Sequence, residues 1–395
     1  MKLLFTLISI LFITTLTAQD FTGFNQGHVN QKGYYTTVPY TLKRDKLIIQ
    51  VELNGKLHNF LFDTGAPTSI SAELAAELNS PLMSKIEIVD ANDLKDSLQV
   101  VKLDNLKIGD VTFKDTPVLV IKDFGPLGCL NIDGFIGSNL LRNSIVHIAS
   151  KTKTITLTDI AKKLPLNRKN SVKMLVEQGQ SSPLISIDLV TKDITADETL
   201  LVDTGMSGFY DLSTAVYDNA KQYNLFTTLG QATGFFTIGL YGVAKAEQQY
   251  KVGIPGIAIG RNGFSNVTAT TTSDKRSRIG IEILKHGNIT LDYKNGRFYF
   301  DPFGDVNNID LTEKTWPFKP IIKDEKMIVG IVWDKALEAQ LKPGDEILSF
   351  GSHNLTGLDT CQKLLFEMDV PQDSTTLVIK DAKTGETRTV QVVKQ

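Results

Sequence analysis

The 395-residue sequence contains the tripeptide Asp-Thr-Gly twice, at residues 63–65 and again at residues 203–205. Each copy follows a short apolar run, Phe60–Phe62 in the first half and Leu200–Val202 in the second. A single Asp-Thr-Gly after a strand is ordinarily only a turn or a helix cap. Two copies in matching surroundings indicate instead that two similar units face each other, each contributing one carboxylate.

The sequence around the two tripeptides repeats as well. A predicted strand, a polar turn and a second predicted strand precede each Asp, starting at Lys46 in the first half and at Leu184 in the second. Downstream, an isoleucine followed by glycine recurs at Ile136-Gly137 and Ile279-Gly280, and β-rich runs follow both pairs. This internal duplication predicts a mainly β fold built from two similar lobes.

These motifs resemble those of retropepsin-like aspartic peptidases, in the pepsin and retropepsin clan, with both lobes fused in one polypeptide. The segment Leu61–Ala66 and the following Ser69–Ser71 are similar to the family's active-site turn. Asp133–Gly137 is similar to the glycine-ended strand that passes beside that turn. The resemblance covers about residues 36–303 and implies two β-barrel lobes with the active site between them.

The resemblance implies that one Asp from each loop holds the nucleophilic water, that the two Thr hydroxyls tie the loops together, and that the glycines keep substrate access open. The residues concerned are Asp63, Thr64 and Gly65 in the first loop and Asp203, Thr204 and Gly205 in the second. The chemistry is consistent with these roles. Peptide hydrolysis needs a base for water and an acid for the carbonyl oxygen, and a carboxylate pair that shares one proton supplies both.

The sequence suggests no cofactor and no metal. Its five histidines are scattered, and neither a His-Glu-x-x-His run nor paired cysteine ligands occur. A Gly-x-Ser-x-Gly elbow and a phosphate-binding Gly-x-x-x-x-Gly-Lys loop are also missing. The carboxylate pair is therefore the only catalytic arrangement that the sequence offers.

The residue after the tripeptide is small in the first copy, Ala66, but is Met206 in the second. Met206 either crowds the dyad or packs beneath its loop, and we favour packing. Neither residue offers the hydroxyl with which pepsin-like members stabilise the ionised carboxylate. Losing that hydrogen bond raises the pKa of the pair, so a weakly acidic to neutral pH optimum is expected.

Peptidases of this type cover their substrate with a mobile β-hairpin. In the first lobe the expected flap is Ile86–Val101, with a polar tip at residues 90–96. In the second lobe Gly230–Gly242 combines four glycines with three aromatic residues, which suits either a flap or a glycine-punctuated core strand.

After Pro302 a further unit begins. A predicted strand at Lys326–Trp333, a short helix at Lys335–Leu341, the turn Lys342–Asp345 and a helix at Leu358–Met368 resemble the order of bacterial PDZ domains. The resemblance implies binding of a peptide or a C-terminus, although a purely structural role is equally open. The predicted organisation is a signal peptide at 1–18, lobe one at 36–165, lobe two at 166–303, a linker at 304–316 and a PDZ domain at 317–395.

The first 18 residues resemble a secretory signal, which predicts an exported protein, periplasmic or secreted, without a stable membrane anchor. Cys129 and Cys361 are the only cysteines, and they are expected to be buried and unpaired. The net charge of −2 gives no argument for nucleic-acid binding, and the basic tract Lys275–Arg278 is expected to be a solvated loop.

Three functions from different classes follow. The first is an exported aspartic endopeptidase that acts on polypeptide substrates and whose PDZ domain presents or selects them. The second is a catalytically inactive peptide-binding protein of the same fold, in which Met206 blocks the second lobe. The third is an envelope scaffold protein that acts through contacts of the PDZ domain.

Overall fold

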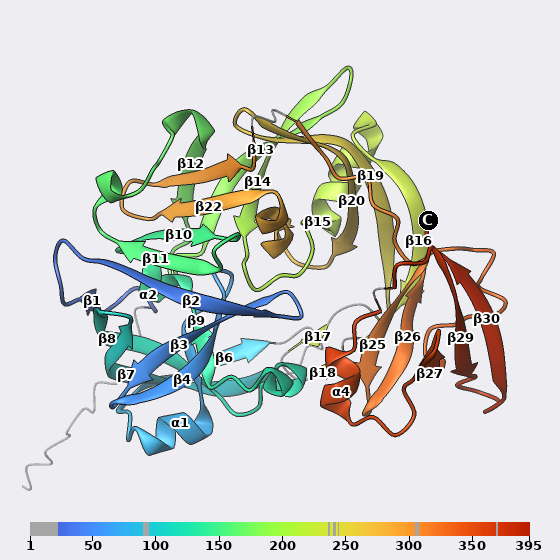
Figure 1. Cartoon of the computed structure of the whole chain (residues 1–395), viewed down its shortest axis with the longest axis horizontal. Coiled ribbons are helices and arrows are strands. Elements are labelled where there is room, and N and C mark those ends of the chain that lie inside the picture. Colours follow the sequence, from blue (N-terminus) through green and yellow to red (C-terminus); the bar gives the residue numbers. More distant parts are fainter. Residues whose placement is uncertain are drawn as a thin grey trace, which may run out of the picture.

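The computed structural model describes residues 23–89, 95–235, 238–239, 242–243, 245–304, 308–368 and 370–395. The predicted signal at 1–18 and most of the first flap tip lie outside these residues. Among the described residues, no helix has both the length and the apolar character that a membrane span requires. The fold is mainly β, as predicted: a 22-stranded sheet system is followed by a separate six-stranded sheet (Figure 1).

We refer to residues 36–165 as lobe one, to residues 166–303 as lobe two, and to residues 317–395 as the C-terminal domain. The main elements of lobe one are β2 (Tyr35–Lys43), β3 (Lys46–Leu53), β4 (Lys56–Phe62), β5 (Ser69–Ser71), α1 (Ala72–Glu77), β6 (Leu82–Val89), β7 (Lys95–Ile108), β8 (Val111–Ile121), η1 (Gly125–Leu130), β9 (Gly134–Ile136), α2 (Ser138–Leu141), β10 (Ile145–Ala149) and β11 (Thr154–Thr158). Those of lobe two are β12 (Ser171–Val176), β13 (Pro183–Val190), β14 (Thr195–Val202), β15 (Tyr210–Ser213), α3 (Thr214–Ala220), β16 (Thr227–Gly234), β17 (Ile238–Gly239), β18 (Gly242–Val243), β19 (Glu247–Ile259), β20 (Asn262–Thr272), β21 (Arg278–Ile279), η5 (Ile281–Lys285), β22 (Gly287–Asp292) and β23 (Arg297–Pro302).

The duplicated sequence frame folds into duplicated topology. In lobe one the strand that ends before Asp63, β4, runs parallel to β9, with Phe62 opposite Ile136. In lobe two the strand that ends before Asp203, β14, runs parallel to β21, with Val202 opposite Ile279. Each Ile-Gly element thus lies beside an Asp-Thr-Gly loop because it pairs with the strand that carries the Asp.

Strands from both halves of the chain meet in one sheet. β10 of lobe one pairs antiparallel with β22 of lobe two, and β11 and β23 flank this pair. The buried apolar side chains of both lobes form one continuous core. This shared sheet and core hold the lobes in a fixed relation, which fixes the distance between their loops.

The described part of the segment proposed as a second flap runs from strand β16 toward the C-terminal domain. Over Gly230–Gly234, β16 pairs with β19, and Gly234 is buried. Beyond its end, the Phe235 N–H donates to the Gly330 carbonyl of the C-terminal domain at 2.8 Å. Phe236 and Tyr241 of the proposed flap lie outside the described residues.

The C-terminal domain has its own core and sheet. Its elements are β25 (Phe318–Lys323), β26 (Lys326–Val332), β27 (Glu346–Phe350), β28 (His353–Asn354), α4 (Thr360–Leu365), β29 (Ser374–Lys380) and β30 (Thr387–Val393). The helix predicted at Lys335–Leu341 is wrong: this stretch forms hydrogen-bonded turns, in which the N–H groups of Glu338 and Gln340 bond to carbonyls three residues back, so no α-helical ladder propagates. The predicted helix at Leu358–Met368 is shorter, starting at an Asp359 capping box and ending where Phe366 becomes extended.

The predicted linker at 304–316 is also more ordered than expected. It contains β24 (Asn308–Asp310), which pairs parallel with β20 of lobe two. Ile309 and Leu311 pack against the shared core of the two lobes. The chain is therefore fastened to lobe two before it enters the C-terminal domain.

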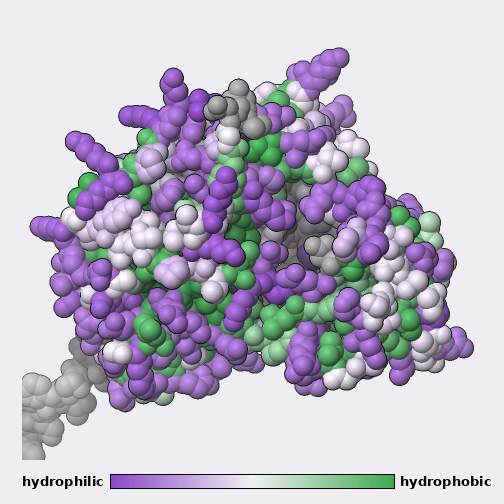
Figure 2. Space-filling model, viewed as in Figure 1, coloured by the Kyte–Doolittle hydropathy of each residue, from purple (hydrophilic) through white to green (hydrophobic). Residues whose placement is uncertain are grey.

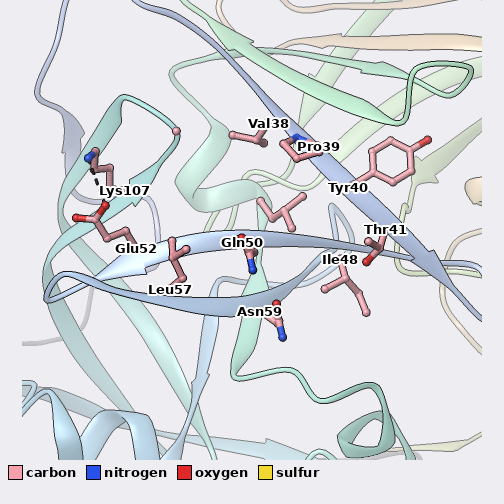
Figure 3. A pocket seen from close by; sticks show the side chains of 12 residues that line it. Val38, Pro39, Tyr40, Thr41, Ile48, Gln50, Glu52, Leu57, Asn59 and Lys107 are labelled. Carbon is pink, nitrogen blue, oxygen red and sulfur yellow. Dashed lines mark hydrogen bonds and ion pairs between the residues drawn. The ribbon is translucent and has the colours of Figure 1, made fainter.

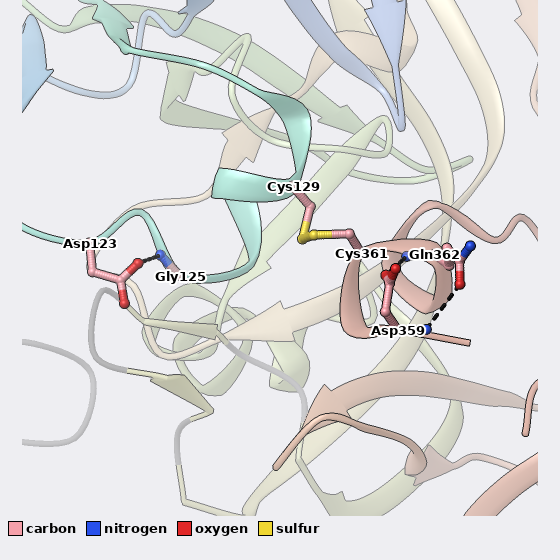
Figure 4. The surroundings of a disulfide bond; sticks show 6 residues. All are labelled: Asp123, Gly125, Cys129, Asp359, Cys361 and Gln362. Carbon is pink, nitrogen blue, oxygen red and sulfur yellow. Dashed lines mark hydrogen bonds between the residues drawn. A yellow bond between two sulfur atoms is a disulfide. The ribbon is translucent and has the colours of Figure 1, made fainter. Parts of the chain in front are cut away.

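The prediction of two unpaired cysteines is wrong. Cys129 of η1 and Cys361 of α4 form a disulfide across 232 residues of sequence (Figure 4). The bond joins lobe one to the C-terminal domain, whose fold brings α4 against η1. Spacing in the sequence cannot reveal such a pair, because only tertiary packing brings the two Cα atoms to 5.0 Å.

Candidate active site

The two Asp-Thr-Gly loops start from the same backbone anchor. The Asp63 N–H donates to the Ile136 carbonyl at 3.0 Å, and the Asp203 N–H donates to the Ile279 carbonyl at 2.9 Å. Apolar strand residues on both sides of each anchor are buried, so the loops begin from rigid positions. The sequence motifs Ile136-Gly137 and Ile279-Gly280 therefore position the two carboxylates.

The threonines cross-link the loops with near two-fold symmetry. The Thr64 hydroxyl donates to the Val202 carbonyl at 2.6 Å, and the Thr204 hydroxyl donates to the Phe62 carbonyl at 2.9 Å. Each threonine N–H donates to the hydroxyl of the other at 3.1 Å. Because both side chains are buried, water does not compete for these four bonds, and the loops are held face to face.

The glycines allow the carboxylates to approach one another. A Cβ atom added to Gly65 would lie 2.6 Å from Asp203 Cγ, and one added to Gly205 would lie 2.2 Å from Asp63 Oδ2. Each carboxylate thus lies directly over the glycine of the opposite loop. The structure brings together all six residues that the sequence predicted for the site.

The two carboxylates differ in their hydrogen bonds. Asp63 Oδ1 accepts from the N–H groups of Gly65 at 2.9 Å and Ala66 at 3.2 Å. Asp203 Oδ1 accepts from the Gly205 N–H at 2.9 Å. Burial and the neighbouring charge of Asp203 raise the pKa of Asp63 to about 7, and a hydrogen bond links the two side chains. The pair consequently retains one shared proton at weakly acidic pH.

Arg278 belongs to the site, although its basic tract was expected to be solvated. The side chain is only 25% exposed, and Nη1 lies 3.6 Å from Asp203 Oδ2. Nη2 lies 3.1 Å from Asp211 Oδ2 and 3.0 Å from Asp274 Oδ2. The guanidinium therefore stabilises negative charge on Asp203. The position of Arg278 directly before Ile279-Gly280 is the sequence signal that could have identified it.

Two further polar side chains reach across the lobes to the glycine carbonyls. Lys46, at the start of β3, donates to the Gly205 carbonyl and to Ser207 Oγ, the latter at 3.1 Å. From lobe two, Gln180 Nε2 donates to the Gly65 carbonyl at 3.1 Å. Burial lowers the pKa of Lys46, while the charges of the dyad act in the opposite direction. Neither contact could be predicted from the sequence, because both depend on how the lobes face each other.

Met206 packs within its own loop. The side chain is buried, and its Cε atom lies 3.2 Å from where a Cβ of Gly280 would be. Its N–H donates to the Asp203 carbonyl, at 3.2 Å, and not to the carboxylate. This geometry favours the packing interpretation, in which Met206 fills space beside Gly280.

One pocket of lobe one lies away from the predicted site. The pocket in Figure 3 lies along β2, β3 and β4, and none of the six loop residues lines it. In the part of the chain that the structure describes, no cluster of three or more His, Cys, Asp or Glu side chains could hold a metal ion.

Comparisons with known proteins support the assignment for part of the chain. No curated protein matches the sequence. Among solved structures, the basic 7S globulin from soybean has 8% sequence identity and a TM-score of 0.39, over 68% of this chain and 95% of that one. Residues 49–140, which include the first Asp-Thr-Gly loop and its Ile-Gly element, match the family model of aspartyl proteases.

Proposed function

We propose that the protein is an aspartic endopeptidase that hydrolyses peptide bonds with a water held between Asp63 and Asp203. The observation that carries this proposal is the crossed threonine network, which brings one carboxylate from each lobe to a common point. The aspartyl protease match over residues 49–140 supports the same chemistry.

The asymmetry of the pair suggests how the roles divide. Asp203, beside Arg278, is the ionised member and takes a proton from the attacking water. Asp63, whose raised pKa keeps it protonated, donates to the carbonyl oxygen of the substrate. The tetrahedral intermediate then collapses: Asp203 gives its proton to the leaving nitrogen, the C–N bond breaks, and a hydroxyl of the intermediate returns its proton to Asp63, so the pair again holds one proton.

We also propose that the protein is exported and that residues 317–395 form a PDZ domain that binds polypeptide. The apolar N-terminal run supports export, and the disulfide between Cys129 and Cys361 is consistent with an oxidising compartment. The PDZ assignment is supported by the order of strands around α4 in a sheet with its own core.

The test is cleavage of a denatured protein mixture by the purified chain and by Asp63→Asn and Asp203→Asn variants. Each substitution is expected to lower kcat/KM by about 10³-fold or more, because a shared proton requires both carboxyl groups. Asp193→Asn, at an exposed turn, is the matched control. Activity that survives both dyad substitutions would exclude this catalyst. A wild-type chain that binds peptides but cleaves none would instead be the catalytically inactive binding protein.

A further inference from the structure

The two Asp-Thr-Gly loops have different surroundings beyond the dyad. Figure 2 shows the surface hollowed between the lobes and the C-terminal domain. The residues that follow the Asp203 loop, Ser207–Asp211, line a groove between lobe two and this domain. The Asp63 loop is supported from lobe two by Gln180, which lies in the turn between β12 and β13. This support is connected to the Asp63 carboxylate through a single peptide unit.

That peptide unit is the one between Gly65 and Ala66. Gln180 Nε2 donates to its carbonyl, on Gly65, at 3.1 Å. Its N–H, on Ala66, donates to Asp63 Oδ1 at 3.2 Å. A chain of hydrogen bonds therefore runs from the Gln180 amide through the peptide unit to the carboxylate. Bonds in such a chain polarise one another, so donation by Gln180 strengthens the bond that the carboxylate accepts.

The orientation of the Gln180 amide is fixed by a second acceptor. The same Nε2 donates to Ser182 Oγ at 2.7 Å, and Ser182 is buried. Because the Gly65 carbonyl can only accept, the nitrogen of the amide and not its oxygen must face the Asp63 loop. Both N–H groups of the amide are therefore used, one for the loop and one for Ser182.

The corresponding contact in the other loop does not reach its carboxylate. Lys46 donates to the Gly205 carbonyl. The N–H of that peptide unit, on Met206, donates to the main-chain carbonyl of Asp203 at 3.2 Å. A side chain of the opposite lobe is therefore linked by hydrogen bonds to the carboxylate of Asp63, whereas the corresponding link to Asp203 ends at its backbone.

The N-terminal segment, residues 23–27, holds the turn of lobe two on both sides of the glutamine. The Phe24 N–H donates to the Gly179 carbonyl at 2.7 Å, and Ser181 Oγ donates to Asn25 Oδ1 at 2.7 Å. Ser181 has a φ of 61°, which is unfavourable for a residue with a side chain, so the bond to Asn25 helps to hold it. The residue between Gly179 and Ser181 is thereby fixed.

The N-terminal segment is anchored in lobe one. The Phe24 side chain is buried in an apolar cluster with Leu98 and Val100 of β7 and with Leu119 and Ile121 of β8. Strand β7 forms a hairpin with β6, and its two cluster residues lie within the segment expected as the first flap. The N-terminal segment therefore connects this hairpin of lobe one to the turn of lobe two.

We propose that Gln180 is a positioning residue for Asp63, that it acts through the peptide unit between Gly65 and Ala66, and that the N-terminal segment holds it in place. Fixing this peptide unit keeps the Asp63 carboxyl group directed toward the opposite carboxylate. The inference rests on the proposed peptidase function and adds a residue that supports its dyad.

Loss of the Gln180 amide is expected to make Asp63 harder to ionise. Burial and the neighbouring Asp203 raise the pKa of Asp63, whereas the Gly65 N–H and the charge of Lys46 lower it. Gln180 is neutral, so Gln180→Ala leaves these charges unchanged and removes only the support of the second backbone donor. A weaker hydrogen bond to the ionised carboxylate raises its pKa further.

The pH–rate profile of the full-length chain is the first test, with a peptide that wild type cleaves. Gln180→Ala is expected to lower kcat about five- to tenfold with little change in KM, and to move the alkaline limb up by about half a pH unit. Gln180→Glu has the same length but cannot donate when ionised, so it should move the limb further. Gln180→Lys retains a donor and should restore most of kcat. Gln178→Ala, at an exposed position of the same turn, is the matched control and should change neither quantity.

Asn25→Ala tests the role of the N-terminal segment. The substitution removes the acceptor for Ser181 Oγ, so a smaller shift of the alkaline limb in the same direction is expected. Asn30→Ala, at an exposed position five residues further on, is the control. The double variant Asn25→Ala with Gln180→Ala should shift the limb no more than Gln180→Ala alone, because Asn25 acts through Gln180. Additive shifts would show that the segment does not act through Gln180.

Unfolding measures the same ionisation without catalysis. Asp63→Asn gains stability as pH rises above the unfolded-state pKa, and this gain levels off at the folded-state pKa of about 7. In the Gln180→Ala chain the gain should level off about half a pH unit higher.

The two measurements separate this inference from the proposed function. If wild type cleaves no peptide but the levelling-off point moves, the peptidase proposal fails and the positioning role of Gln180 stands. If peptides are cleaved and Gln180→Ala moves neither the alkaline limb nor the levelling-off point, the positioning role is wrong and the peptidase proposal stands. An unmoved levelling-off point in a chain that cleaves nothing would overturn both.

Discussion

The two Asp-Thr-Gly loops share a tripeptide and a backbone anchor, yet they surround their carboxylates differently. Asp63 receives two backbone N–H groups and has no cation in direct contact among the described residues. Asp203 receives one N–H group and lies 3.6 Å from the Arg278 guanidinium. The symmetric motif thus fixes where the carboxylates are, whereas the asymmetric neighbours decide which one carries the negative charge.

The lobes also differ in how they hold the C-terminal domain. Lobe one is joined to it by the disulfide between Cys129 and Cys361. Lobe two holds it by non-covalent contacts, including the bond from the Phe235 N–H to the Gly330 carbonyl. The two lobes therefore hold the C-terminal domain by different kinds of contact.

The pH–rate profile gives the largest expected effect. Because the pKa of Asp63 is raised to about 7, the shared proton is lost above that pH. We expect kcat/KM to fall about tenfold per pH unit above pH 7, with an optimum at weakly acidic to neutral pH. A profile that peaks below about pH 3 would contradict the assignment of the proton to Asp63.

Removal of the disulfide tests the difference in attachment. Cys129→Ser and Cys361→Ser are each expected to lower the free energy of unfolding by about 2–5 kcal/mol, since the bond closes a long loop. Urea denaturation under non-reducing conditions measures the effect. The double variant should be no less stable than either single variant, because the same bond is lost; additive losses would show that the cysteines act separately.

Removal of Arg278 tests the charge asymmetry. Arg278→Gln is expected to lower kcat/KM about 10–100-fold, because the negative charge on Asp203 loses its neighbouring cation. Arg276→Gln is the matched control, since Arg276 lies two residues away and pairs with Glu177. Equal effects of the two substitutions would remove Arg278 from the site. Arg278→Lys should restore part of the activity.

The stability of Asp63→Asn tests the cost of ionising this carboxyl. The folded-state pKa of Asp63 lies above its unfolded value, so its contribution to stability is present at low pH and lost as pH rises through about 7. Asp63→Asn is therefore expected to increase the free energy of unfolding by about 2 kcal/mol at pH 8 and little at pH 4. Thermal unfolding at both pH values, with Asp193→Asn as control, provides the measurement. A gain of the same size at both pH values would show that the added stability does not come from the ionisation of Asp63.

Substitution of the residue after each tripeptide is expected to change the pH–rate profile least. Ala66→Thr and Met206→Thr each introduce a hydroxyl that can stabilise the ionised pair, so the alkaline limb should move down by less than about one pH unit. Met206→Thr should also cost about 1–3 kcal/mol of stability, because a buried side chain is truncated. If Ala66→Thr destabilises the fold as much as Met206→Thr, the packing role of Met206 is wrong.

The sequence alone predicted the mainly β fold and named the six loop residues that the structure brings together. It could do so because these features are local and repeated: alternating apolar strands, a turn tripeptide, and an Ile-Gly pair at nearly the same distance from each Asp. The helix predicted at Lys335–Leu341 is wrong for the opposite reason, since its pattern is short and unrepeated and does not by itself specify a helix.

Tertiary structure alone decided the other contacts between distant parts of the chain. The disulfide of Cys129, the contact of Arg278 with Asp203 and the placement of Lys46 beside Ser207 all depend on how independently folded surfaces meet. Such contacts have no period and no fixed spacing in sequence. Charge at the site is a sum over these long-range neighbours, so the motif determined which two carboxylates meet and the packing determined their protonation.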